Sequence, residues 1–407
     1  MSTTKHLKHL KNLKIDEVDE NIEELEVVVE DVFPALVGTV VVSLIILGIF
    51  LSRLYIRWSV DCTSKNKMTG KTIVITGANT GLGRATATEL AKRGGRVILA
   101  CRDKVKGEAV ARTIRKKVNN QNVIAMKCDL GNLRAIKDFA TELCENEREV
   151  NVLINNAAYM GPKGSTADGL EKCFGVNYLG HFYLTWLLQE KLRKSAPARI
   201  INVTSDCYVK GKLDFDDLAM TKSYTIFDAY CRSKLAMIVF NQECHRHYST
   251  GVIFSYAVHP GAVSTDLLRN WPGLTGNILR AASRVLFKSP EQGCQTIVHC
   301  AIADKIREHS GKLFVNCRQT KVKEYVRDKE LGKKLWNVSL HLCGLDSEIV
   351  EDPEPDVAAA GATEIPEAAK AAKEAERPAA PQPSKPASQP QPAQQPSASA
   401  QSYDNQE

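Results

Sequence analysis

Residues 72–83 read Thr72-Ile-Val-Ile-Thr-Gly-Ala-Asn-Thr-Gly-Leu-Gly83. The first five are apolar or β-branched, which favours a buried strand. Helical periodicity over Arg84–Arg93 begins directly after the glycines. A glycine-rich turn between a strand and a helix lets the backbone approach a pyrophosphate at the helix N-terminus, so the stretch predicts a nucleotide-binding loop. The loop residues expected to bind are Gly77, Asn79, Thr80, Gly81, Leu82 and Gly83.

From residue 67 to 346, short apolar runs alternate with stretches of helical periodicity. Strands that are almost entirely apolar and separated by helices predict a parallel sheet covered on both faces. The predicted fold class is therefore α/β, a doubly wound parallel sheet of Rossmann type in a single domain. The predicted strands are Thr72–Thr76, Arg96–Ala100, Val123–Cys128, Val152–Asn155, Arg199–Thr204, Ile253–Val258 and Lys312–Phe314.

Residues 32–52 contain no charged side chain. About twenty helical residues at ~1.5 Å each span a hydrocarbon core of about 30 Å, so we expect a transmembrane anchor over residues 32–55. A signal peptide is disfavoured because the preceding segment is long and acidic and no small-residue cleavage site follows. The flank before the anchor is acidic and the flank after it is basic, which places the rest of the chain in the cytoplasm. The endoplasmic reticulum is the expected membrane, with a mitochondrial membrane as the alternative.

The composition excludes some classes of function. The formal charge of +7 arises from 54 basic and 47 acidic residues without a dense basic block in the globular part, which gives no reason to expect a nucleic-acid partner. The 12 cysteines are scattered, and none are spaced as CxxC. We therefore expect free thiols in a reducing compartment and no metal site.

Both ends of the chain differ in composition from the middle. Residues 1–31 form a polar tail in which apolar residues recur at helical spacing, so a short amphipathic helix and a solvated tail are both open. Residues 350–407 are rich in Ala, Pro, Gln and Ser, which predicts disorder because too little apolar surface can be buried. Pro378–Pro381 after Arg377 fits a weak SH3-type partner, with a plain solvated tail as the simpler reading.

Further motifs follow the loop in a fixed order. They are Asn155-Asn156-Ala157, Asn177, Ser205, Tyr230-x-x-x-Lys234, His259-Pro260-Gly261 and Thr265. Together with the TGxxxGxG spacing of the loop, these motifs resemble the short-chain dehydrogenase/reductase superfamily over about 280 residues. The resemblance implies cofactor contacts from Asn155, Ala157, Pro260, Gly261 and Thr265, and an approach of Asp129 to the adenine, although Asp129 also suits a helix cap.

Tyr230 and Lys234 suit the proton transfer that accompanies hydride transfer. A tyrosine four positions before a lysine lies on the same helix face, and its hydroxyl can give or accept the proton. The Lys234 ammonium would favour phenolate, lower the tyrosine pKa and reach the ribose hydroxyls. Ser205 would hydrogen-bond the substrate oxygen. By resemblance, Asn177 would hold a water in the proton relay.

The end of the second predicted strand bears on the cofactor. A carboxylate there binds the adenosine ribose, whereas an arginine accommodates a 2′-phosphate. The sequence has Cys101-Arg102, with no acid before the arginine. NADP(H) is therefore the expected cofactor, with an ordinary surface arginine as the alternative interpretation of Arg102.

Five stretches place the chain within the superfamily: residues 100–103, 229–236, 259–261, 289–293 and 335–339. In these stretches the chain resembles membrane-bound retinol dehydrogenases that use NADP. The resemblance implies interconversion of retinaldehyde and retinol or related lipophilic compounds, mainly reductive because cytoplasmic NADP pools are held reduced. Alternatives are a same-fold reductase of a steroid, lipid aldehyde or quinone, or a membrane scaffold that binds NADP without turnover.

Two features bear on specificity. Many relatives have glycine where this chain has Ala158, which would alter packing beside the cofactor. The segment from Asp266 to Lys288 is rich in leucine, and we expect it to form a mobile cover over the nicotinamide that sets substrate preference.

Overall fold

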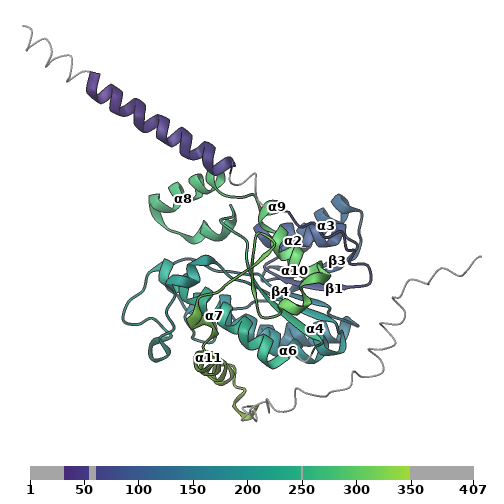
Figure 1. Ribbon diagram of the computed structural model, residues 1–407. Helices are drawn as coiled ribbons and strands as arrows, with labels where there is room; N and C mark the ends of the chain where they lie inside the picture. Colours follow the sequence, from purple (N-terminus) through teal and green to yellow (C-terminus); the bar gives the residue numbers. More distant parts are fainter. Residues whose placement is uncertain (1–31, 55–60, 249–250, 349–407) are drawn as a thin grey trace, which may run out of the picture. The chain divides into compact units, whose positions relative to one another are not determined.

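The computed structural model describes residues 32–54, 61–248 and 251–348 (Figure 1). The predicted tails, residues 1–31 and 350–407, lie outside the described residues, so the expectations of an amphipathic helix, disorder and an SH3-type partner stay predictions. Residues Val32–Leu54 form one helix that is long and apolar enough to cross a membrane, and it lies within the predicted anchor of residues 32–55.

The folded domain is built on one eight-stranded sheet. The strand order is β3-β2-β1-β4-β5-β6-β7-β8, and all neighbouring strands are parallel except β7 and β8. This confirms the predicted doubly wound α/β fold. The strands are β1 (Thr72–Thr76), β2 (Arg96–Cys101), β3 (Val123–Lys127), β4 (Val152–Asn155), β5 (Ala198–Val203), β6 (Ile253–His259), β7 (Leu313–Val315) and β8 (Arg318–Thr320).

Alternate residues of the strands serve two separate cores. On β1, Ile73 and Ile75 pack into one apolar cluster while Val74 packs into the other. Such alternation is the period of two that places successive side chains on opposite faces. The first cluster lies under α2 (Gly81–Lys92), α3 (Lys104–Val118) and α10 (Gln295–Ile302). The second lies under α4 (Leu133–Asn146), α6 (Gly180–Lys194), α7 (Ile226–Tyr248) and α11 (Lys329–Leu342).

The order in which strands are added to the sheet reverses between β1 and β4. After β1, the chain adds β2 and β3 on one side and then returns to place β4 on the other side of β1. In open parallel sheets, the carboxyl ends of the strands at such a reversal form the crevice that binds ligands. The predicted glycine loop follows β1 at this point.

Candidate active site

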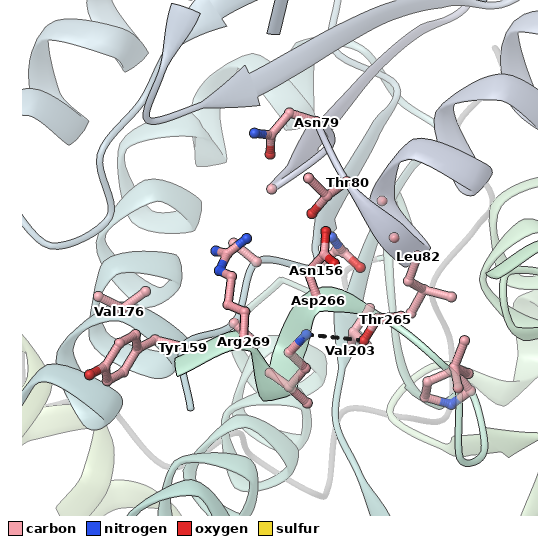
Figure 2. Close-up of a pocket in the computed structure, with 18 of the residues that line it drawn as sticks. Asn79, Thr80, Leu82, Asn156, Tyr159, Val176, Val203, Thr265, Asp266 and Arg269 are labelled. Carbon is pink, nitrogen blue, oxygen red and sulfur yellow. Dashed lines mark hydrogen bonds between the residues drawn. The ribbon is translucent and has the colours of Figure 1, made fainter. Parts of the chain in front are cut away.

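A cavity of about 840 Å³ opens at the carboxyl ends of the strands. Figure 2 shows the loop residues Asn79, Thr80 and Leu82 on one side of it and Tyr159 with Val176 on another, while Thr265 and Arg269 come from the segment after β6. The predicted residues in its wall are Gly77, Asn79, Thr80, Gly81, Leu82, Gly83, Arg102, Asp129, Ala157, Ser205, Tyr230, Lys234, Pro260, Gly261 and Thr265.

The glycine loop is held in close contact with neighbouring backbone. Gly77 has φ +64°, and a side chain there would lie 2.9 Å from the Cα of Ala157. A Cβ on Gly83 would lie 2.5 Å from the carbonyl oxygen of Gly77. Thr80 precedes α2 in an extended conformation and makes no side-chain cap, so the first N–H groups of α2 are available to an anion. The loop therefore fits a dinucleotide pyrophosphate.

The carboxyl end of β2 presents two cations to the cavity. Arg102 follows the strand and is exposed. Lys106, one turn into α3, also lines the cavity, and its Nζ lies 3.2 Å from a carboxylate oxygen of Asp103. Lys106 was not among the residues expected from the sequence. Its closeness in sequence to Arg102, just after the end of a predicted strand, is the signal that could have identified it.

Two residues singled out in the sequence do not line the cavity. Asn155 is buried, and its amide donates to Thr185 Oγ1 at 3.1 Å and to Asn202 Oδ1 at 2.8 Å. Asn177 lies in a π-helical turn, Gly175–Leu179, and is fully buried. Its Oδ1 accepts the backbone N–H of Tyr159 at 2.6 Å, and its Nδ2 donates to Ser233 Oγ at 2.9 Å. The Asn177 side chain and the amide nitrogen of Asn155 are thus occupied by other residues in this structure.

Tyr230 and Lys234 lie one turn apart on α7. Burial raises the pKa of Tyr230 well above its usual value, with neighbouring thiols adding to the effect. Burial also lowers the pKa of Lys234 to about 8. The Lys234 Nζ donates to the carbonyl oxygen of Val203 at 2.9 Å and lies 5.5 Å from the centroid of the Tyr230 ring. The lowering of the tyrosine pKa expected from the sequence is therefore not found, because burial of the phenol dominates.

The loop that carries Ser205 is tied to the loop after β6. His259 Nε2 lies 3.0 Å from a carboxylate oxygen of Asp206, and this contact lowers the pKa of Asp206. The backbone N–H of Asp206 donates to His259 Nδ1 at 3.3 Å. Asp206 and His259 thus fix Ser205 relative to Pro260 and Gly261. The sequence did not predict this contact, because the two residues are far apart along the chain.

Apolar side chains surround Tyr230. Met160, Cys173 and Ala229 form a buried cluster with it. Leu267, Leu268 and other half-buried apolar residues pack against this cluster, and both leucines also line the cavity. The cavity is polar where the glycine loop and Arg102 lie and apolar beside Tyr230. It can hold a charged dinucleotide at one end and a lipophilic molecule at the other.

Residues 71–273 match the short chain dehydrogenase family, and curated relatives align over most of the chain. The chain belongs to this family. It is 44% identical over 288 residues to "Retinol dehydrogenase 12" of Mus musculus, covering 70% of this chain and 90% of the relative. It is 43% identical to "Retinol dehydrogenase 13" of Homo sapiens, covering 72% and 91%.

A solved structure of an uncharacterised Mycobacterium paratuberculosis protein is also similar. Its TM-score is 0.56 at 30% identity, covering 70% of this chain and 97% of that one. The sequence and fold thus make the chain an oxidoreductase that acts on CH–OH donors with a nicotinamide dinucleotide.

Proposed function

We propose that the chain interconverts a lipophilic aldehyde and its alcohol, retinaldehyde and retinol being the pair that its relatives' names support, with NADP(H) as cofactor and mainly in the reductive direction. The observation that carries the proposal is the apolar cluster around Tyr230, together with Leu267 and Leu268, which pack against the cluster and line the cavity. A polyene chain is apolar and suits such a wall.

Bound reduced nicotinamide supplies the hydride. Tyr230 then gives its phenolic proton to the substrate oxygen, and burial keeps that phenol protonated at neutral pH. Ser205 donates a hydrogen bond to the same oxygen. Lys234 offers a cation to the phenolate that forms and to the ribose hydroxyls. For Asn177 we propose the role of holding a relay water that the family resemblance implies, although its side chain is occupied and its backbone carbonyl oxygen lies 2.9 Å from His181 Nδ1.

The remaining cofactor contacts are part of the same proposal. Arg102, supported by Lys106, would bind the 2′-phosphate of NADP. Asp129 would approach the adenine, although its Oδ1 also accepts the N–H of Gly131 at 3.0 Å, which keeps the cap alternative open. Asn155 would act through its backbone, since its side chain is buried between strands.

The domain organisation and location are also proposed. The Val32–Leu54 helix would anchor the chain once in a membrane, with the domain of residues 67–346 on the cytoplasmic side. The basic flank after the helix supports this side. We propose the endoplasmic reticulum as the membrane, with mitochondrial residence as the outcome that would replace it.

A substrate panel tests the proposal. Full-length protein in liposomes is supplied with NADPH and, in turn, all-trans-retinaldehyde, nonenal, a ketosteroid, a quinone and glyceraldehyde. We expect the highest kcat/KM for retinaldehyde and poor turnover of glyceraldehyde. A preference for the steroid or quinone would remove the retinoid assignment but keep the reductase. Binding of NADPH with no turnover of any compound would favour the scaffold.

A further inference from the structure

Helix α8 (Gly273–Leu286) carries its apolar side chains on the outside of the domain. Leu274 is 74% exposed, Ile278 58% and Val285 41%. With Ala281, which is also exposed, these residues recur at three- and four-residue spacing and form one stripe along the helix. Exposed apolar residues are ordinary when scattered, but a contiguous stripe of this kind marks an interaction surface.

The face of α8 that packs on the domain is small and polar. Gly276 and Ser283 are buried there, and a Cβ on Gly276 would overlap the carbonyl oxygen of Trp271. Arg280 Nη1 donates to the carbonyl oxygens of Leu268 and Trp271 at 3.0 and 3.2 Å. These contacts hold α8 with its apolar stripe outward, which is the reverse of the usual arrangement of a surface helix.

The covalent chain places this part of the domain near a membrane. The backbone N–H of Cys62 donates to Gln295 Oε1 at 3.2 Å, which fastens the segment after the anchor to α10. Whatever path residues 55–60 take, the chain from Leu54 to Asp61 spans at most about 25 Å. Helix α8 ends at Leu286, shortly before Gln295. A domain tethered so closely meets the lipid surface far more often than any soluble partner.

The charges beside the stripe fit lipid headgroups. Arg284, on the border of the stripe of α8, is exposed. A helix with apolar residues on one face and basic residues at its border lies in the plane of a bilayer interface. If two copies of the chain met through this face, Arg284 of one copy would approach Arg284 of the other, and the like charges would repel each other.

We propose that α8 inserts its apolar stripe into the headgroup region of the membrane that holds the anchor, and that substrate enters the cavity from the lipid beside it. Helix α8 packs on Asp266–Asn270, whose Leu267 and Leu268 line the cavity, and Phe287 at its end lines it too. The entry route rests on the proposed function, whereas the docking of α8 does not.

Photochemical cross-linking tests the docking in the full chain. A benzophenone amino acid replaces Ile278, and the protein is reconstituted in vesicles of phosphatidylcholine with phosphatidylserine. The control carries the same group at Lys333, which is exposed on α11, over the sheet face opposite to α10. We expect lipid adducts at position 278 and only background at 333. Adducts to a second copy, adducts to the chain's own anchor, or no adduct at 278 would overturn the proposal.

Kinetics test the entry route. The double variant Leu274→Glu and Ile278→Glu should lower kcat/KM about tenfold or more for retinaldehyde delivered in vesicles, since two apolar anchors are lost. It should leave kcat/KM in detergent micelles unchanged, and Lys333→Glu should change neither. Equal losses in both media would overturn the entry route. Absence of turnover by the unmodified chain would instead contradict the proposed function, and the cross-linking result would still decide the docking.

Discussion

Tyr230 is a phenol whose surroundings favour its neutral form. Burial and three nearby thiols all oppose ionisation and raise its pKa. A protonated phenol is ready to donate when a carbonyl is reduced, while alcohol oxidation first requires the phenol to lose its proton. The raised pKa thus keeps the proposed acid protonated at neutral pH.

Replacing Tyr230 with Phe should therefore abolish most turnover while NADPH binding is retained. Loss of a positioned acid generally costs about 10²–10⁴-fold in rate, and only the transferable proton is removed. Single-turnover rates and NADPH fluorescence titration measure the two effects. Tyr224→Phe serves as the control, since its hydroxyl donates to the Gly161 carbonyl at 2.8 Å and does not line the cavity. Normal turnover by Tyr230→Phe would reject the assignment of the acid.

Cofactor preference should depend on Arg102 and Lys106 together. Changing both to Ala should weaken NADPH binding relative to NADH, because each charge-assisted hydrogen bond to a phosphate contributes about 1.5–3 kcal/mol. Dissociation constants for both cofactors give the ratio. Arg112→Ala, an exposed change on the same helix, is the control. An unchanged ratio in the double variant would assign phosphate recognition elsewhere. Cys101 is unsuitable for an Asp replacement, because it is buried and would hold a carboxylate away from water.

Sequence motifs predicted which residues gather at the cavity better than how they are oriented. The loop glycines, Ser205 and Tyr230 all line it, because strand ends and one helix face fix their places. The orientation of Asn177 depends on a π-helical turn, which the spacing of apolar residues in the sequence does not predict. The same holds for the link from Asp206 to His259, which depends on how separate loops pack.

At the scale of elements, apolar strands were predictable and polar elements were not. Strands β1 and β4 begin and end where predicted, and the other predicted strands shift by at most one residue at an end. Strand β8 was missed because Arg318–Thr320 is polar and fully exposed, so its sequence carries no alternation. For the segment that contains α8, the sequence predicted only a mobile cover from Asp266 to Lys288 and no helix. Its outward apolar stripe follows from packing against Trp271, which sequence patterns do not show.

His181 on α6 should make the fold sensitive to acid. It is fully buried between Thr76 Oγ1, at 2.8 Å, and the carbonyl oxygen of Asn177, at 2.9 Å. Burial lowers its pKa to about 3, whereas the unfolded chain keeps the usual value of about 6.5. Between these values the unfolded state binds one more proton. Stability should therefore fall as the pH decreases below about 6.5, by up to about 1.4 kcal/mol per pH unit.

Denaturant unfolding of the full chain in detergent, at about pH 7 and about pH 5, checks this contribution. His181→Gln should flatten the difference between the two pH values, since glutamine does not titrate. His309→Gln, at a half-exposed site, should leave the difference as it is. An unaltered acid slope in His181→Gln would contradict the explanation.

For the whole molecule, glycosylation reports which side of the membrane the domain occupies. Two N-x-S/T glycosylation sequences occur, one beginning at Asn202, which is buried in β5, and one at Asn337, which is exposed on α11. Because only Asn337 is accessible in the folded domain, it is the useful reporter. We expect no glycan on Asn337 in cells, detected as no mass shift with a glycosidase. The variant Lys14→Thr completes a sequon at Asn12 on the other side of the anchor and should gain a glycan. Glycan on Asn337 would invert the orientation, and none at either site would favour the mitochondrial membrane.

Strand β8 bears on how the domain would behave if it is anchored as proposed. An anchored protein is confined to two dimensions, where neighbours collide repeatedly with similar orientation. Any unpaired sheet edge is then a standing template for chain-to-chain pairing. Here the edge beyond β7 is closed by three exposed, antiparallel residues led by Arg318, too short and too polar to recruit another strand. The short hairpin would thus disfavour self-association through the sheet edge at the high local densities that the proposed anchor would impose.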